Sequence, residues 1–139
     1  MAQPIEDFPS RPRLLLRGLL RRCAWCGDSK AYFTSWFKRQ DRCQNCGHGY
    51  RRGDSAFELG AITANIILTF GSILLTILIL IAFTAPDVPI GTLTIVTAAI
   101  GIVGPALFYP ISFTLWQAVD LWMRRPTAAE LAGEGDATL

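Results

Sequence analysis

The chain contains 139 residues, of which 51% are hydrophobic and 17% are charged, and its formal net charge is +2 at neutral pH. Charged residues are absent from two long stretches, 59–86 and 88–119. A chain of this length holds nothing else large enough to cover two such apolar runs. The composition therefore argues against a soluble domain and favours an α-helical membrane protein.

The first segment, 1–22, is a basic, leucine-rich arm that ends in the sequence RPRLLLRGLLRR. Its leucines and arginines alternate in a way that predicts an amphipathic helix lying in the membrane interface. The alternative is that the leucines pack on the segment that follows.

The second segment, 23–53, contains all four cysteines as two C-x2-C pairs with sixteen residues between them: Cys23, Cys26, Cys43 and Cys46. This spacing is typical of a zinc site with four thiolate ligands, and four thiolates leave no open position for a substrate. We therefore expect a structural zinc ion that provides most of the folding energy of this small head, about 10–16 kcal/mol. Iron in a rubredoxin-like site, a redox dithiol and transient metal carriage are the alternatives.

Two further features accompany the cysteines. Gly27 and Gly47 each follow the second cysteine of a pair, where they supply the φ freedom that a tight turn needs. His48 is the only histidine, and we expect a partly exposed side chain beside a ligand set that the cysteines already complete.

Aromatic and basic residues alternate between the two cysteine pairs. They predict a short β-hairpin, which would make the head a zinc ribbon. The aromatic rings could stack on nucleic-acid bases, or they could cover the metal while the cations face lipid headgroups; the second interpretation is favoured. The residues are Tyr32, Phe33, Trp36 and Phe37, with Lys30, Lys38, Arg39 and Arg42.

The two apolar runs predict a transmembrane hairpin, and each exceeds the roughly 20 residues that cross a bilayer as a helix. Ser55 and Glu58 form a capping-box pattern at the first helix start, and Asn65 should find a partner across the helix interface. Pro105 and Pro110 should kink the second helix. The predicted segments are a first span at 54–86, an external turn at 87–91, a second span extending into the cytoplasm at 92–125 and an acidic flexible tail at 126–139.

Lysine and arginine are distributed unevenly beside these spans. Residues 1–60 hold eleven of the thirteen, Arg124 and Arg125 hold the other two, and the turn holds none. The positive-inside rule then places both termini in the cytoplasm, with the protein in the cell's inner (plasma) membrane. Thiols are kept reduced there, which disfavours disulfides.

Several of these pieces, taken in order, resemble one family. The pieces are RRCAWCG, AYF and WFK, CQNCGHGY, GDSAFE and YPISFTLWQAVDLWMRRP. The chain looks like a member of the bacterial domain-of-unknown-function family numbered 983, from about Arg22 to Pro126. The resemblance implies a zinc-ribbon-like head on a two-helix hairpin, although Ala24 stands where family members often carry proline. It implies no established reaction, and the gene setting of some members is similar to that of cytochrome oxidase assembly factors.

The sequence shows no Ser/His/Asp set, paired carboxylates or glycine-rich phosphate loop, so we expect no enzyme and identify no small-molecule substrate. We expect an accessory or adaptor protein that contacts the lipid bilayer and other membrane proteins. Metal or thiol handling in the assembly of a membrane metalloenzyme such as a respiratory oxidase is one alternative. Membrane-tethered nucleic-acid binding is the other.

Overall fold

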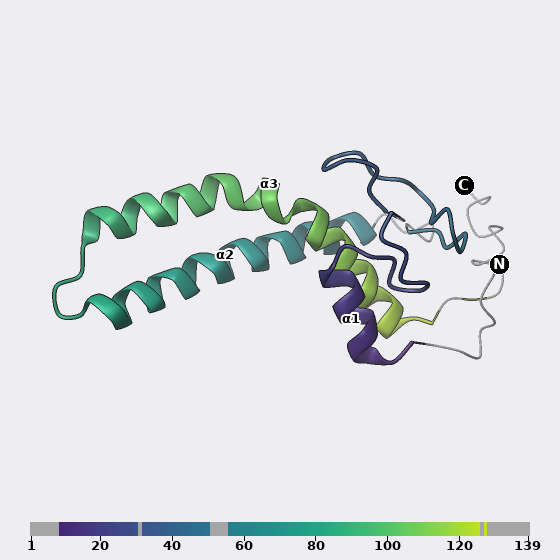
Figure 1. Ribbon diagram of the computed structural model, residues 1–139, viewed down its shortest axis with the longest axis horizontal. Helices are drawn as coiled ribbons and strands as arrows, with labels where there is room; N and C mark the ends of the chain where they lie inside the picture. Colours follow the sequence, from purple (N-terminus) through teal and green to yellow (C-terminus); the bar gives the residue numbers. More distant parts are fainter. Residues whose placement is uncertain (1–8, 31, 51–55, 126, 128–139) are drawn as a thin grey trace.

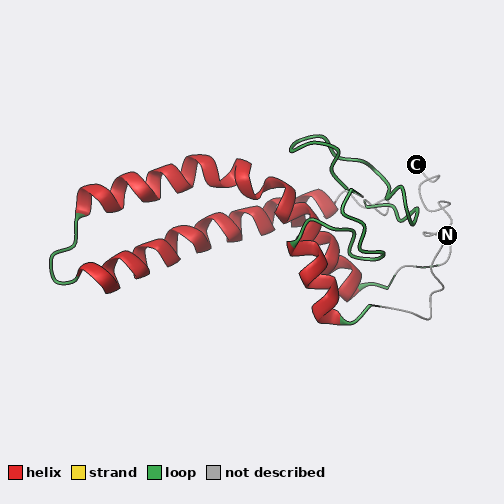
Figure 2. Cartoon of the chain, in the orientation of Figure 1, coloured by secondary structure: helices red, strands yellow, loops and turns green. Residues whose placement is uncertain are grey.

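The fold consists of three helices and a loop-built head, seen in a computed structural model that describes residues 9–30, 32–50, 56–125 and 127. The helices are α1 (Arg11–Leu19), α2 (Ala56–Thr84) and α3 (Ile90–Met123) (Figure 1). The two long helices run side by side and are joined by a short turn, and α1 packs on the end of α3 nearest Met123. Loops between α1 and α2 form the head beside α1 (Figure 2).

The long helices are confirmed as long and apolar enough to cross a membrane. At about 1.5 Å per residue, the 29 residues of α2 and the 34 of α3 extend roughly 43 and 51 Å, more than a hydrocarbon core of ~30 Å. Only 6% of the most apolar window of each helix is buried. The apolar side chains therefore face outward, unlike those of a core helix in a soluble protein.

Burial changes along α3 and divides the hairpin into two parts. From Ile90 to Val103 the helix is largely exposed. Between Pro110 and Leu121 it is largely buried beneath α1 and the head. We call this second part the covered end; its buried residues include Ser112, Phe113, Thr114, Gln117, Ala118, Asp120 and Leu121.

Helix α1 approaches α3 closely because it carries a glycine at the contact. A Cβ on Gly18 would lie 2.8 Å from the Thr114 carbonyl oxygen and 2.9 Å from Ala118 Cβ. Thr114 Oγ1 donates a 2.6 Å hydrogen bond to the Gly18 carbonyl, and Leu14 is fully buried. One face of α1 is thus packed, with Leu15 half-buried, while Leu16 and Leu19 remain exposed.

Pro105 and Pro110 lie inside α3, and we attribute to them the bend that this helix shows in Figure 1. Pro110 has no N–H to donate to the carbonyl of Ala106, four residues earlier, and that oxygen accepts a 2.9 Å bond from Trp36 Nε1 instead. Asn65 Nδ2 donates to the neighbouring Pro105 carbonyl at 2.9 Å. The expected partner of Asn65 across the helix interface is therefore confirmed, and it is a backbone oxygen at the bend.

The predicted β-hairpin of the head is not confirmed. Among the described residues no strand forms, and only isolated bridges pair Phe33 with Arg39 and Arg42 with Gly49. The chain still reverses between Tyr32 and Gln40, whose N–H donates to the Tyr32 carbonyl at 2.8 Å. Ser55 of the predicted capping box and nearly all of the 126–139 tail lie outside the described residues.

Candidate metal centre

The structure brings the four cysteine sulfurs into one cluster that could bind a metal ion. The Sγ atoms of Cys23 and Cys46 lie 3.8 Å apart, those of Cys26 and Cys43 lie 3.7 Å apart, and all four lie within 4.8 Å of one another. A tetrahedral site with metal–sulfur bonds of ~2.3 Å has sulfur–sulfur edges of about 3.8 Å. The cluster therefore has the dimensions of a four-thiolate metal site.

The two cysteine pairs have the same backbone geometry. In the first, Cys23 N donates to the Asp28 carbonyl and Gly27 N to the Cys23 carbonyl, both at 2.8 Å. In the second, Cys43 N donates to the His48 carbonyl at 2.9 Å and Gly47 N to the Cys43 carbonyl at 2.8 Å. Gly27 has φ +85° and Gly47 has φ +73°, so both positions need the left-handed conformation that glycine allows. The expectation for the two glycines is confirmed.

Hydrogen bonds among the four thiols shift their pKa values in opposite directions: Cys26 and Cys43 favour the thiolate form, whereas Cys23 and Cys46 favour the thiol. Hydrogen bonding to Cys23 lowers the pKa of Cys26 to about 6. The same partner lowers the pKa of Cys43, whereas hydrogen bonding to Cys26 raises the pKa of Cys23. Three of the cysteines are buried and Cys26 is half-buried, so a bound ion would be largely shielded from solvent.

Aromatic rings fill the space between the cluster and α3. Tyr32 packs against Tyr50 with ring centroids 3.9 Å apart, and it also faces Phe113 of α3 at 6.5 Å. Burial raises the pKa of Tyr50 above its ordinary range. His48 was predicted to be partly exposed, and this is wrong: its side chain is 1% exposed, and its ring stands edge-on to Tyr50. The carbonyl of His48 closes the second cysteine turn, which fixes the residue inside the head.

Three side chains attach the head to the three helices. Arg17 of α1 donates from Nη1 to the Trp25 carbonyl at 2.7 Å, and Trp36 Nε1 donates to the Ala106 carbonyl of α3 at 2.9 Å. Arg39 Nη2 pairs with Glu58 Oε1 of α2 at 2.8 Å, while the Arg39 guanidinium lies 4.8 Å from the Phe113 ring. The head is therefore fixed against all three helices and is not a separate tethered unit.

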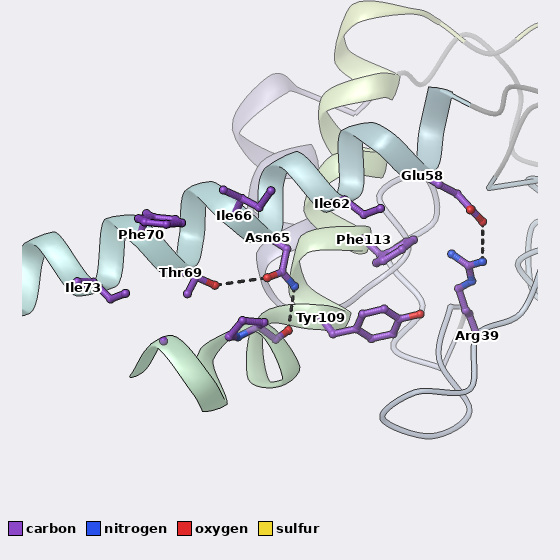
Figure 3. Close-up of a pocket in the computed structure, with 12 residues that line it drawn as sticks. Arg39, Glu58, Ile62, Asn65, Ile66, Thr69, Phe70, Ile73, Tyr109 and Phe113 are labelled. Carbon is purple, nitrogen blue, oxygen red and sulfur yellow. Dashed lines mark hydrogen bonds and ion pairs between the residues drawn. The ribbon is translucent and has the colours of Figure 1, made fainter. Parts of the chain in front are cut away.

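A groove of about 560 Å³ runs between α2 and α3 from this attachment point (Figure 3). The Arg39–Glu58 pair lies at one end, and Thr69 Oγ1 donates a 3.4 Å hydrogen bond to Asn65 Oδ1 along the wall of the groove. Apolar side chains such as Ile66 and Phe70 line the remainder. The sequence analysis named Arg39, Glu58 and Asn65 individually. It did not predict the Arg39–Glu58 pair, since this pair joins two separate segments whose contact no local pattern reveals.

Comparison with known proteins adds one finding. A family model described as a protein of unknown function (DUF983) matches residues 33–125. The match includes Cys43, Cys46 and both long helices, whereas Cys23 and Cys26 precede it. Comparisons with curated proteins and with solved structures found no match.

Proposed function

Since the chain belongs to the DUF983 family of proteins of unknown function, we propose that it is a membrane accessory protein whose head is folded by one structural zinc ion. The observation that carries the proposal is a closed cluster of four thiols in a head that is bonded to all three helices. Such a head is suited to presenting a fixed surface to other membrane proteins.

The donor set supports zinc in a structural role. Four sulfur ligands complete a tetrahedral shell and leave no position for water or a substrate. Three of the sulfurs are buried, which favours slow exchange over delivery of the metal. Without the ion, the buried cysteines would have to hold the two turns together through thiol contacts alone, so we assign the folding of the head to the metal. The protein then has no catalytic role.

The charge distribution supports a cytoplasmic head. Eleven of the thirteen lysines and arginines precede residue 61, and the turn between α2 and α3 carries none. We place both chain ends in the cytoplasm and the 85–89 turn on the outer face of the inner membrane. The exposed leucines of α1, Leu16 and Leu19, and the residue that follows the helix, Leu20, then lie at the cytoplasmic side, where they provide apolar surface for a partner protein.

Metal analysis of the purified chain tests the structural role. We expect one zinc ion per chain. Cys23→Ser should lose both the ion and the near-ultraviolet circular dichroism signal that ordered, buried aromatic rings give. Asn45→Ser is the matched control because Asn45 is an exposed non-ligand in the second cysteine turn, and it should retain both. A Cys23→Ser protein whose head stays ordered without metal would favour metal handling instead.

Native mass spectrometry after mild detergent extraction tests the accessory role. We expect the zinc-bearing chain to be released together with other membrane proteins. A zinc-bearing chain that is repeatedly released alone would contradict the role as an adaptor while leaving the structural metal intact.

A further inference from the structure

The head carries two exposed aromatic rings at the tip of the segment 33–39, which we call the aromatic loop. Trp36 is 38% exposed and Phe37 is 64% exposed. Cations surround them: Lys38 is exposed beside Phe37, and the Arg21 guanidinium lies 4.6 Å from the Trp36 ring. Neighbouring apolar rings rimmed by positive charge are typical of protein surfaces that enter anionic membranes.

The position of the aromatic loop along α3 indicates how deep the loop lies in the membrane. Trp36 Nε1 bonds to the Ala106 carbonyl at 2.9 Å, and the Phe37 ring lies 5.6 Å from that of Tyr109. Ala106 follows the first residue of α3, Ile90, by 16 residues, a rise of about 24 Å. A hydrocarbon core is ~30 Å thick, so a helix that enters it at Ile90 still has Ala106 inside it.

At this depth the Trp36 hydrogen bond satisfies a carbonyl that would otherwise have no donor. Pro110 leaves the Ala106 carbonyl without its helical donor, and hydrocarbon offers no water to replace that donor. The indole N–H supplies the missing bond, which fixes the aromatic loop against the bend of α3. In Figure 1 this loop is the dark blue segment of the head that extends back along α3.

We propose that the aromatic loop is a membrane-inserting element, whose partner is the acyl-chain region of the head-side leaflet. Trp36 and Phe37 lie among the acyl chains, and Lys38 and Arg21 meet the phosphates of anionic lipids at the leaflet surface. A nucleic-acid platform fits less well, because the Trp36 N–H already bonds to α3 and Arg21 occupies a face of its ring. The inference rests on the membrane placement proposed above.

Depth-dependent fluorescence quenching of the full, metal-loaded chain in phosphatidylcholine–phosphatidylglycerol vesicles tests the proposal. The emission that belongs to Trp36 is the difference between the wild type and Trp36→Phe. We expect it to be largely lost with lipids brominated near the start of the acyl chain, and little affected by aqueous iodide. Quenching by iodide but not by brominated lipid, in protein that floats with the vesicles, would overturn the inference. Protein that does not float would instead overturn the membrane placement.

A second measurement does not depend on the tryptophan substitution. The photoreactive amino acid benzoylphenylalanine replaces Phe37 in one protein and Gln44, an exposed residue of the second cysteine turn, in another. We expect lipid adducts on illumination from position 37 and not from position 44. Equal lipid labelling at both positions, or Trp36 emission that responds to single-stranded RNA while lipid adducts are missing, would contradict insertion.

Discussion

Single side chains connect the parts of this protein by bonding to backbone carbonyls. Trp36 bonds to Ala106, Asn65 to Pro105 and Thr114 to Gly18. The first two oxygens lie at the bend of α3, and the third lies in the last turn of α1, where the Gly18 carbonyl also accepts a bond from Arg21 N at 3.2 Å. Each bond therefore satisfies or supplements an acceptor at a point where regular helical bonding weakens.

A double-mutant cycle on Trp36 and Pro110 tests the first of these bonds. Trp36→Phe keeps an aromatic ring but leaves the Ala106 carbonyl without its donor, and we expect a loss of about 1–3 kcal/mol in the free energy of unfolding. In a Pro110→Ala background the backbone N–H at position 110 is restored, so the same substitution should cost less. Equilibrium unfolding in detergent measures both costs; equal values would show that the indole bond does not replace the helical one.

Residue-level prediction succeeded where the chemistry was local. The cysteine spacing, the two glycine turns and the need of Asn65 for a partner follow from short sequence patterns or from the cost of an unpaired amide in an apolar span. The Trp36 bond was not predicted because its donor and acceptor are 70 residues apart. His48 was placed wrongly because its burial depends on rings contributed by other parts of the head.

At the scale of helices, the docking of α1 on α3 depends on the small surface around Gly18. The close approach of its backbone to Thr114 and Ala118 leaves no room for a side chain. Arg17, the preceding residue, bonds to the Trp25 carbonyl of the first cysteine turn. Helix α1 thus connects the cysteine cluster to α3, and its displacement should weaken the packing of both the head and α3.

Gly18→Ala tests this contact. The added methyl group would meet a backbone oxygen and a neighbouring Cβ, so we expect α1 to shift away from α3 despite the higher helix propensity of alanine. Hydrogen exchange should become faster at α1 amides. Gly71→Ala in α2 is the matched control, since no atom lies within 4 Å of its added Cβ, and it should leave α1 protection unchanged. Equal α1 protection in both variants would contradict the importance of the close approach.

The sequence predicted the two long helices because an uncharged run of that length has few other structures available. It predicted the amphipathic character of α1 but not the surface it contacts, since periodicity identifies an apolar face and not its partner. The hairpin of the head was not confirmed because the segment 33–39 is held by its contacts with α3 and by short backbone pairs, without a continuous ladder.

The whole molecule is strongly asymmetric along its long axis (Figure 1). At one end the two long helices expose apolar side chains up to the turn at 85–89. At the covered end α1, the cysteine-containing head and the buried half of α3 form one packed layer. All four cysteines lie in that layer, and none lies in the turn.

The location of the cysteines gives a direct test of topology. Asp87 is exposed in the turn, so Asp87→Cys places a thiol at the opposite end from the native ones. With the head in the cytoplasm, a membrane-impermeant maleimide should label the Asp87→Cys protein in sealed spheroplasts and leave the wild type unlabelled. Detergent and a chelator together should then expose the native thiols. Labelling of the wild type in sealed spheroplasts would reverse the proposed orientation.

The contact between Thr114 and Gly18 also constrains the order of events during synthesis. These residues are 96 positions apart, so a ribosome that adds about 5–20 residues per second makes α1 roughly 5–20 s before its partner on α3. The last cysteine, Cys46, is made much earlier than Thr114. The nascent head therefore has all four of its cysteines before the helix that receives it has been synthesised, so the thiols can come together before the head docks on α3.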